Sequence, residues 1–220
     1  MKIDFISDIA CPWCVIGLKA LEQAIERVGP QVQAQIQFHP FELNPGMAEA
    51  GQEIVEHLSQ KYGISAEQVA ANAANIRARG AELGFEFGVS KRSRVYNTRP
   101  AHRLLHWAGL QSDEAQRALK HALFKAYFTD GHNPGDAAVL ERCAREAGLD
   151  GDEAAQVLVS DRFESEVVAA EQHWQQNGIS SVPTMIINDK YMISGGQPVD
   201  HFERALRQIA EEEASAAQAG

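Results

Sequence analysis

Hydrophobic and polar positions near the amino terminus predict one strand, one helix and a second strand. Residues 2–7 alternate between polar and apolar side chains, which is typical of a short strand with one buried face. Residues 15–28 carry apolar side chains at helical spacing, and Gly29 with Pro30 ends that helix. Residues 34–41 alternate again. The chain therefore begins with a βαβ unit, whose crossover is expected to be right-handed.

Helical periodicity replaces this alternation between residues 51 and 178. Ser65 and Gln68 have the spacing of a capping box, and the helix that they open is expected to reach Gly84. Further apolar stripes at helical spacing lie at residues 115–127, 136–147 and 163–174. The segment is therefore predicted to be a block of helices with almost no strands.

Strand patterns return near the carboxyl terminus. Residues 184–188 and 191–194 are rich in β-branched and apolar side chains and predict a hairpin, and a last helix begins near Val199. The predicted fold class is therefore α/β, with the order β-α-β … β-β-α and a large all-helical insertion. The expected parts are a discontinuous sheet-containing domain at 1–48 and 179–214, a helical insertion domain at 49–178, and a frayed tail at 215–220.

Composition and charge narrow the class of protein. Of 220 residues, 45% are hydrophobic and 23% are charged, as in ordinary globular proteins. The net charge of −10 opposes binding to phosphate backbones, so no nucleic-acid partner is expected. No apolar run approaches the roughly 18 residues of a membrane span, and Asp4 and Asp8 interrupt any signal-peptide stretch. Three cysteines are too few for a disulfide scaffold, so a cytoplasmic protein with reduced thiols is expected.

Cys11, Pro12, Trp13 and Cys14 lie where the first predicted strand ends and the first predicted helix begins. A thiolate at a helix amino terminus meets unpaired N–H groups and the positive end of the helix dipole, which lower its pKa. Pro12 suits the first helical turn because it has no N–H to lose. The pattern predicts disulfide exchange, in which Cys11 attacks a disulfide and Cys14 resolves the mixed disulfide.

A zinc site or two unrelated core cysteines could also account for this pair. A structural zinc site needs a second pair of ligands, and the sequence contains no other Cys-x-x-Cys. The placement of the pair at a strand-to-helix junction argues against inert cysteines. Disulfide exchange is the preferred interpretation.

A second feature lies just ahead of the returning strand, at Ser181, Val182, Pro183 and Thr184. A proline that enters a central strand is disfavoured, because it cannot donate to the hydrogen-bond ladder. The position is explained if the Val182–Pro183 bond is cis and forms a tight turn.

These features together carry a family resemblance. A cis-proline loop opposite an amino-terminal Cys-x-x-Cys is the pairing found in thioredoxin-fold oxidoreductases, and the helical block between the two halves resembles DsbA. Nearly the whole chain resembles the FrnE-like branch, a cytoplasmic group of DsbA-like dithiol–disulfide isomerases. The segments that carry this resemblance, in the family's order, are residues 11–17, 40–45, 97–104 and 180–184.

The resemblance assigns roles to particular residues. It implies that Cys11 is the nucleophile, Cys14 the resolving thiol and Pro183 the cis-proline. It also implies that the backbone of Val182 pairs with a bound peptide or thiol as an added strand. Trp13 would lie on the exposed rim and offer apolar contact to a substrate.

Asp8, Asn97 and His102 are weaker candidates. His102 and His106 share a helix face at zinc-binding spacing, but Arg103 stands where a zincin carries its catalytic glutamate. Two histidines on the polar face of a helix capped by Thr98 are therefore the preferred interpretation, and no metal is expected. The resemblance suggests that Asn97 and His102 come near the active site. Our hypothesis is that these two residues, together with Asp8, line the cleft between the insertion and the sheet domain.

Two carboxylates and one thiol outside the Cys-x-x-Cys motif also need an interpretation. Asp8 precedes Cys11 by three residues, so it is expected near the dithiol, where a carboxylate can relay protons or raise a thiol pKa. Glu42 is expected to be an ordinary solvated residue at the end of the second strand. Cys143 lies on an apolar helical stripe and is expected to be buried packing.

The leading functional hypothesis is a thiol–disulfide oxidoreductase or isomerase that favours reduction or reshuffling in a reducing compartment. The alternative is a glutathione-dependent isomerase or transferase like 2-hydroxychromene-2-carboxylate isomerases or kappa-class transferases, which carry a serine at the position of Cys11. A non-catalytic holdase is a third class, and no sequence feature favours it. No bound cofactor is expected, glutathione is a candidate co-substrate, and the chain is expected to be a monomer or homodimer acting on a disulfide-containing protein or a small thiol.

Overall fold

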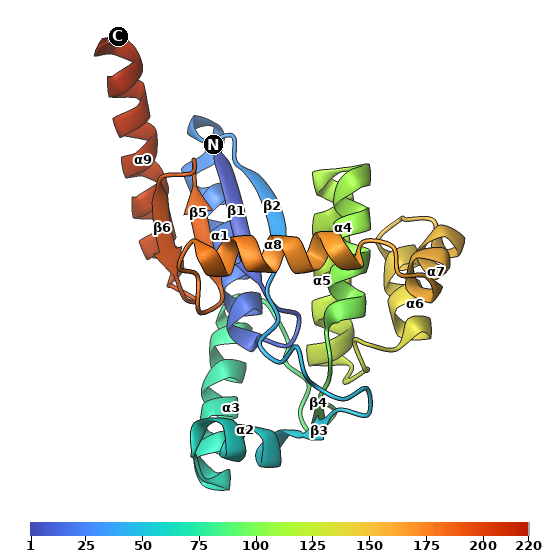
Figure 1. Cartoon of the computed structure of the whole chain (residues 1–220). Helices are drawn as coiled ribbons and strands as arrows, with labels where there is room; N and C mark the ends of the chain where they lie inside the picture. The colour runs from blue at the N-terminus through green and yellow to red at the C-terminus, as the bar shows by residue number, and fades with distance from the viewer. Residues whose placement is uncertain (220) are drawn as a thin grey trace.

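A computed structural model describes residues 1–219, and a four-stranded sheet forms its centre (Figure 1). The strand order is β2-β1-β5-β6. β1 and β2 are parallel, and β5 pairs antiparallel with both β1 and β6. The strands are β1 (Lys2–Ser7), β2 (Gln35–Pro40), β5 (Thr184–Ile187) and β6 (Tyr191–Ser194). The predicted β-α-β … β-β-α order is present.

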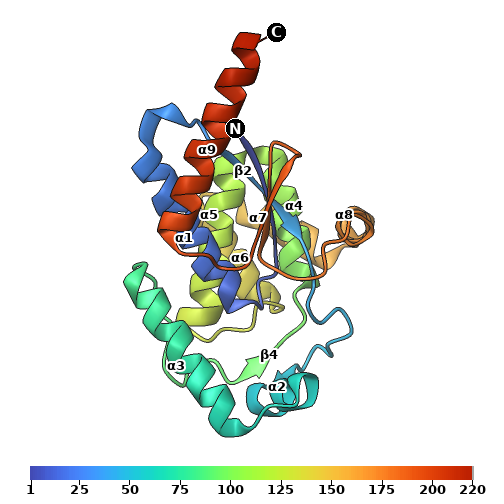
Figure 2. The ribbon, with the colours of Figure 1, turned by 90° about the vertical axis from the view of Figure 1, so that its left-hand side faces the viewer.

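Helices cover both faces of this sheet. α1 (Pro12–Val28) and α9 (Val199–Ala219) pack against each other on one face, and α8 (Glu164–Gln176) crosses the other face, as the edge-on view in Figure 2 shows. A short 3₁₀ turn, η1 (Gly29–Gln31), follows α1. Because both faces are covered, β1 is buried at every position after Lys2, which explains its apolar side chains.

The block of helices between β2 and β5 is confirmed. α4 (Arg99–Gln111), α5 (Asp113–Phe124) and α8 pack directly against β2, so this block shares the hydrophobic core of the sheet. α5 continues as a π-helical turn, η2 (Lys125–Thr129), where the sequence predicts regular helix up to residue 127. The remaining bounds are α2 (Ile54–Tyr62), α3 (Ala66–Glu82), α6 (Ala137–Glu146) and α7 (Gly151–Val159).

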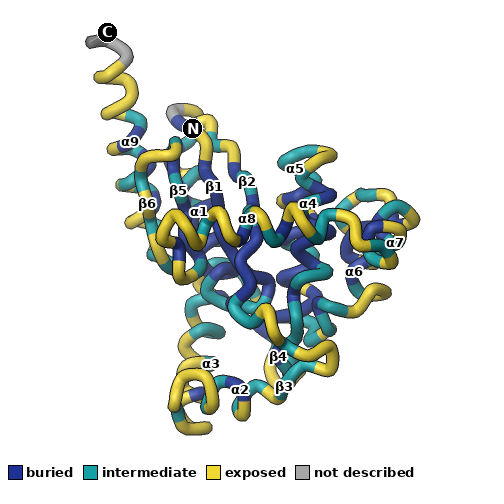
Figure 3. Tube along the Cα trace, in the orientation of Figure 1, coloured by how far each residue is buried: buried dark blue, intermediate teal, exposed yellow. Residues whose placement is uncertain are grey.

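α2 and α3 form a hairpin that stands away from the rest of the chain and is largely exposed in Figure 3. Val69 and Gly80 are the buried residues of α3, and the predicted capping box of Ser65 and Gln68 is present. Two two-residue strands, β3 (Gln52–Glu53) and β4 (Arg94–Val95), pair beside this hairpin. The sequence does not predict them, because an alternating pattern cannot be recognised over two residues.

The carboxyl-terminal helix differs from expectation. α9 extends to Ala219, so the predicted frayed tail at 215–220 is helical up to that residue, and Gly220 lies outside the described residues. Three of the residues at 215–220 are alanine, the strongest helix former, and they follow the glutamates at 211–213, which also favour a helix; this composition explains the extension. Within the described chain, no helix is long and apolar enough to cross a membrane.

Candidate active site

The two cysteines of the predicted motif lie at the amino terminus of α1. Cys11 occupies the N-cap position without a side-chain capping bond, and Pro12 begins the helix. The Cys11 N–H donates to Asp8 O over 3.3 Å, and the Cys14 N–H donates to Cys11 O over 3.1 Å. Both thiols are free and buried, with Cys11 5% exposed and Cys14 fully buried. Cys11 is therefore the thiol that an incoming sulfur can reach.

The surroundings of the two thiols shift their pKa values in opposite directions. A hydrogen bond from the Cys14 thiol lowers the pKa of Cys11, and the backbone N–H groups of Cys14 and Trp13 add to this effect, against burial. Burial raises the pKa of Cys14 well above its usual value, and the neighbouring Cys11 sulfur raises it further. Cys11 is thus the more acidic of the two thiols, and Cys14 is the one that holds its proton more strongly.

The loop ahead of β5 packs against this pair. The Val182–Pro183 peptide bond is cis, as the sequence predicts. The Cys11 thiol points to Val182 O over 3.7 Å. Gly17 allows α1 to approach the loop closely, because a Cβ at this position would lie 3.0 Å from Pro183 Cγ. The cysteine motif and the proline loop, far apart in sequence, therefore meet at one thiol.

Trp13 is half-buried at the side of the active site. The Arg79 guanidinium of α3 lies 5.6 Å from the centre of the Trp13 ring. Arg79 Nη2 also donates to Gly196 O over 3.4 Å. This cation–π contact joins the α2–α3 hairpin to the cysteine motif.

Asp8 is fully buried and accepts several hydrogen bonds. Its oxygens accept from the N–H groups of Ala10 and Leu43 over 3.1 and 2.7 Å, and from Thr98 Oγ1 over 2.8 Å. Burial raises the pKa of Asp8, but the His102 ring and the two backbone N–H groups outweigh it and leave this pKa lowered. The resulting carboxylate raises the pKa of Cys11, which is the direction that the sequence left open.

Asp8, Asn97 and His102 are not among the residues of the cavity wall beside Cys11, whereas the sequence hypothesis places them in the cleft. His102 is 2% exposed, because β2, α5 and α8 pack around α4 and leave it little polar face. Its Nε2 lies 3.4 Å from Asp8 Oδ1. The Asn97 side chain caps α4, because its Oδ1 accepts from the Arg99 N–H. The sequence predicts this capping role for Thr98 instead. Thr98 occupies the N-cap position, but its hydroxyl is directed to Asp8.

Lys120 is a candidate functional residue that the sequence pattern did not single out. It lies on α5, is 1% exposed, and its Nζ donates to Ser7 Oγ over 2.9 Å. Burial lowers the pKa of Lys120 to about 8, although the charges of Cys14, Asp8 and Cys11 oppose this shift. The available signal was a lysine inside an apolar helical stripe, with Leu123 and Phe124 three and four residues further on.

Glu42 is buried, whereas the sequence predicts a solvated residue. The end of β2 is covered by α4 and α8, and Glu42 forms an ion pair with Arg99 of α4. Arg99 Nη2 also lies 3.6 Å from Glu171 of α8. Burial and the nearby Glu42 raise the pKa of Glu171 to about 7.

Cys143 is fully buried on α6, as predicted. Burial raises the pKa of its thiol to about 11. A thiol with such a pKa is protonated at neutral pH and is a poor nucleophile. Cys143 therefore belongs to the packing and not to the site.

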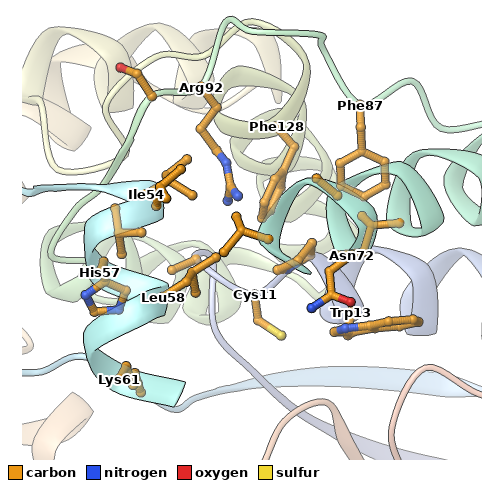
Figure 4. Close-up of a pocket in the computed structure, with 18 of the residues that line it drawn as sticks. Cys11, Trp13, Ile54, His57, Leu58, Lys61, Asn72, Phe87, Arg92 and Phe128 are labelled. Atoms are coloured by element: carbon orange, nitrogen blue, oxygen red, sulfur yellow. The ribbon is translucent and has the colours of Figure 1, made fainter. Parts of the chain in front are cut away.

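A cavity of about 540 Å³ opens beside Cys11 (Figure 4). Its wall combines the amino terminus of α1 with the α2–α3 hairpin, the segment around residues 87–95 and Phe128 of η2. Most of the side chains that form it are apolar or aromatic. A volume of this size lies within the range of about 300–1,000 Å³ that is typical of small-molecule sites.

Residues 2–207 match the family model described as the DSBA-like thioredoxin domain. The chain belongs to this family. The structure of a "probable DsbA oxidoreductase" from Streptomyces coelicolor is 34% identical, superposes with a TM-score of 0.88, and the match covers 97% of this chain and 91% of that one. The fold is thus the thioredoxin-like fold of DsbA with its helical insertion.

Two further proteins are similar over nearly the whole chain. The uncharacterized protein YwbO of Bacillus subtilis (strain 168) is 29% identical over 207 residues, which covers 94% of this chain and 96% of that protein. A 2-hydroxychromene-2-carboxylate isomerase structure is 16% identical with a TM-score of 0.72, and the match covers 98% of this chain and 99% of that one. At this identity the second likeness concerns the fold alone.

Proposed function

We propose that this protein is a cytoplasmic thiol–disulfide oxidoreductase or isomerase of the FrnE-like branch, acting through Cys11 and Cys14. The observation that carries the proposal is the opposite shift of the two thiol pKa values at one helix amino terminus. A lowered pKa increases the fraction of Cys11 that is thiolate, the nucleophilic form, and a raised pKa keeps Cys14 from competing as nucleophile. Membership of the DSBA-like family supports this assignment.

The exchange proceeds in two thiol–disulfide substitutions. The Cys11 thiolate attacks one sulfur of the substrate disulfide, forms a mixed disulfide and releases the other substrate sulfur as a thiolate. Cys14 then loses its proton and attacks Cys11 Sγ, forming the Cys11–Cys14 disulfide and releasing the second substrate thiolate. The substrate gains two electrons, and the protein dithiol loses them.

Glutathione is our candidate for the reductant that restores the dithiol. Two glutathione thiols would reduce the Cys11–Cys14 disulfide and leave as glutathione disulfide, so that the electrons balance. Isomerisation needs no net reductant, because a substrate thiolate displaces Cys11 and forms a new substrate disulfide. The reducing cytoplasm favours reduction and isomerisation of substrates over their net oxidation.

The test uses insulin reduction and refolding of a scrambled disulfide protein. Cys11→Ser should abolish both activities, whereas Cys14→Ala should accumulate a mixed disulfide at Cys11. Cys143→Ala is the matched control, since it removes a buried thiol outside the site and should leave both activities intact. Full activity of Cys11→Ser in either assay would refute the proposal. Trapping with Cys14→Ala in cell extract would identify the bound substrate.

A glutathione-dependent isomerase is the second candidate function. The fold shared with 2-hydroxychromene-2-carboxylate isomerase and the cavity beside Cys11 favour it. Such an enzyme activates bound glutathione and does not need a resolving thiol. Glutathione-dependent isomerisation that survives Cys14→Ala would support this function over dithiol exchange.

A further inference from the structure

The cavity beside Cys11 carries a charge opposite to that of the protein. Lys61, Arg77 and Arg92 line it, while Glu53 is the one carboxylate among the described residues of its wall. Glu53 caps α2 by accepting from the Glu56 N–H over 2.8 Å, so this carboxylate is already engaged. The whole chain has a net charge of −10. A positive cavity in an acidic protein favours an anionic ligand.

Of the cations in the wall, Arg92 is the one whose guanidinium lies over two aromatic rings. Its guanidinium lies 5.0 Å from the centre of the Tyr127 ring and 4.9 Å from that of Phe128. These rings come from η2, whose π-helical turn brings Phe128 into the wall. Figure 4 shows the Arg92 side chain extending into the cavity beside Phe128, with Cys11 on the other side. The rings fix the guanidinium without supplying a negative charge.

Arg92 also keeps capacity to donate hydrogen bonds to a ligand. The guanidinium forms a side-chain hydrogen bond with Tyr127, which leaves most of its five N–H donors for a ligand. Within the part of the chain that the structure describes, no carboxylate forms an ion pair with it. Lys61, by comparison, already donates to Leu43 O and Asn44 Oδ1 over 2.8 and 2.7 Å. A planar guanidinium in apolar surroundings binds a carboxylate through two parallel hydrogen bonds.

The apolar part of the ligand follows from the other walls. Phe87, Phe128 and Trp13 line the cavity together with aliphatic residues of α2 and α3. Val182, where an extended peptide would add as a strand, does not line it, although its carbonyl accepts from Cys11. A small substrate can therefore reach Cys11 through the cavity, by a route separate from the Val182 loop where an extended peptide would bind.

We propose that the cavity holds a small amphipathic disulfide, and that Arg92 binds its carboxylate while one of its sulfurs reaches Cys11. This inference rests on the proposed exchange chemistry and names a substrate class for it. The bonds formed and broken are those of the two substitutions above, and a low-molecular-weight thiol restores the dithiol. Arg92 is thus a specificity-determining residue.

The test compares two aromatic disulfides, one anionic and one neutral. Dithiobis(nitrobenzoate) carries a carboxylate on each ring, dithiodipyridine is neutral, and both release coloured or ultraviolet-absorbing thiols. Arg92→Gln should lower the second-order rate constant of the reduced protein with dithiobis(nitrobenzoate) by about tenfold, equivalent to about 1.4 kcal/mol. The rate with dithiodipyridine should change by less than about twofold, because no hydrogen bond to the neutral ring is lost. The rate constant of Arg92→Lys with dithiobis(nitrobenzoate) should lie between those of the wild type and Arg92→Gln.

Arg142→Gln is the matched control, because it removes the same charge from an exposed position on α6. It should leave both rates unchanged. Equal loss of rate with both disulfides in Arg92→Gln, or no loss with either, would overturn the inference. An equal loss in insulin reduction would also overturn it and would favour an acidic polypeptide as the occupant.

A binding measurement separates this inference from the proposed function. If the wild type reacts with both disulfides no faster than Cys11→Ser, the exchange chemistry itself fails. The cavity can still be tested with anilinonaphthalenesulfonate, a fluorescent amphipathic anion, on the Cys11→Ser, Cys14→Ser double variant. Adding Arg92→Gln should raise the dissociation constant by about tenfold. An unchanged dissociation constant would refute the anion site, whatever the redox activity.

Discussion

Lys120 Nζ donates a hydrogen bond to Ser7 Oγ over 2.9 Å and so joins α5 of the helical block to the end of β1. The two residues are 113 positions apart in sequence. The lysine charge lowers the pKa of Cys14, against the burial that raises it. The block of helices between β2 and β5 thereby supplies a cation near Cys14.

Replacing this lysine should slow the resolving step. Lys120→Met removes a positive charge that favours the Cys14 thiolate, so the pKa of Cys14 should rise further. Each unit of this rise should lower the Cys14 thiolate fraction about tenfold, and it should slow resolution of the mixed disulfide by about threefold, because a more basic thiolate is a better nucleophile. Rapid-quench measurement of mixed-disulfide decay tests the prediction. Lys125→Met, at an exposed position of η2, is the control and should resolve at the wild-type rate.

The same substitution should stabilise the folded protein near neutral pH. The folded pKa of Lys120 lies at about 8, below its value of 10.5 in the unfolded chain, so below pH 8 the folded state carries an unfavourable buried charge. Lys120→Met should raise the free energy of unfolding by about 3 kcal/mol at pH 7, less about 1 kcal/mol for the lost Ser7 hydrogen bond. This advantage should shrink from pH 8 to 10.5, where wild-type Lys120 is neutral when folded. Urea unfolding across this range that shows no such trend would contradict the prediction.

Asp8→Asn should make Cys11 more acidic and the fold less stable. The carboxylate raises the pKa of Cys11, so its removal should shift the thiolate titration, followed by ultraviolet absorbance, to lower pH. The unfolding free energy should fall by about 2 kcal/mol, because buried donors such as the Leu43 N–H lose an ionised acceptor. Glu114→Gln, which changes an exposed carboxylate on α5, should alter neither quantity. A Cys11 titration that moves to higher pH would contradict the prediction that the Asp8 carboxylate raises the pKa of Cys11.

Glu171 should make stability depend on pH between about 4.5 and 7. Its folded pKa, at about 7, lies above the unfolded value of 4.5, so the folded state holds a proton that the unfolded state releases in this window. Its contribution to stability is therefore complete below pH 4.5 and is lost as the pH rises through 7. Glu171→Gln keeps a neutral side chain at every pH and should gain thermal stability relative to wild type as the pH rises. Glu166→Gln, an exposed position on the same helix, should follow the wild-type curve.

Features that depend on neighbours along the chain could be predicted from the order of the amino acids. Alternation and helical spacing predicted β1, α1 and β2, and the junction of Cys11 with a helix amino terminus predicted its lowered pKa. The Val182–Pro183 turn and the buried state of Cys143 also followed from local pattern. Such features are predictable because backbone geometry and the helix dipole act over a few residues.

The tertiary structure alone decided which polar groups surround the dithiol. Thr98 lies where a helix cap was predicted, but the packing of α4 against the sheet domain directs its hydroxyl to Asp8, 90 residues away. Glu42 and Lys120 carry charges that usually remain in water, and both are buried with partners from distant elements. A pattern read along one strand or helix contains no information about the element that will cover it. The pKa values that separate Cys11 from Cys14 depend on those covering elements, because burial and nearby charge act through space.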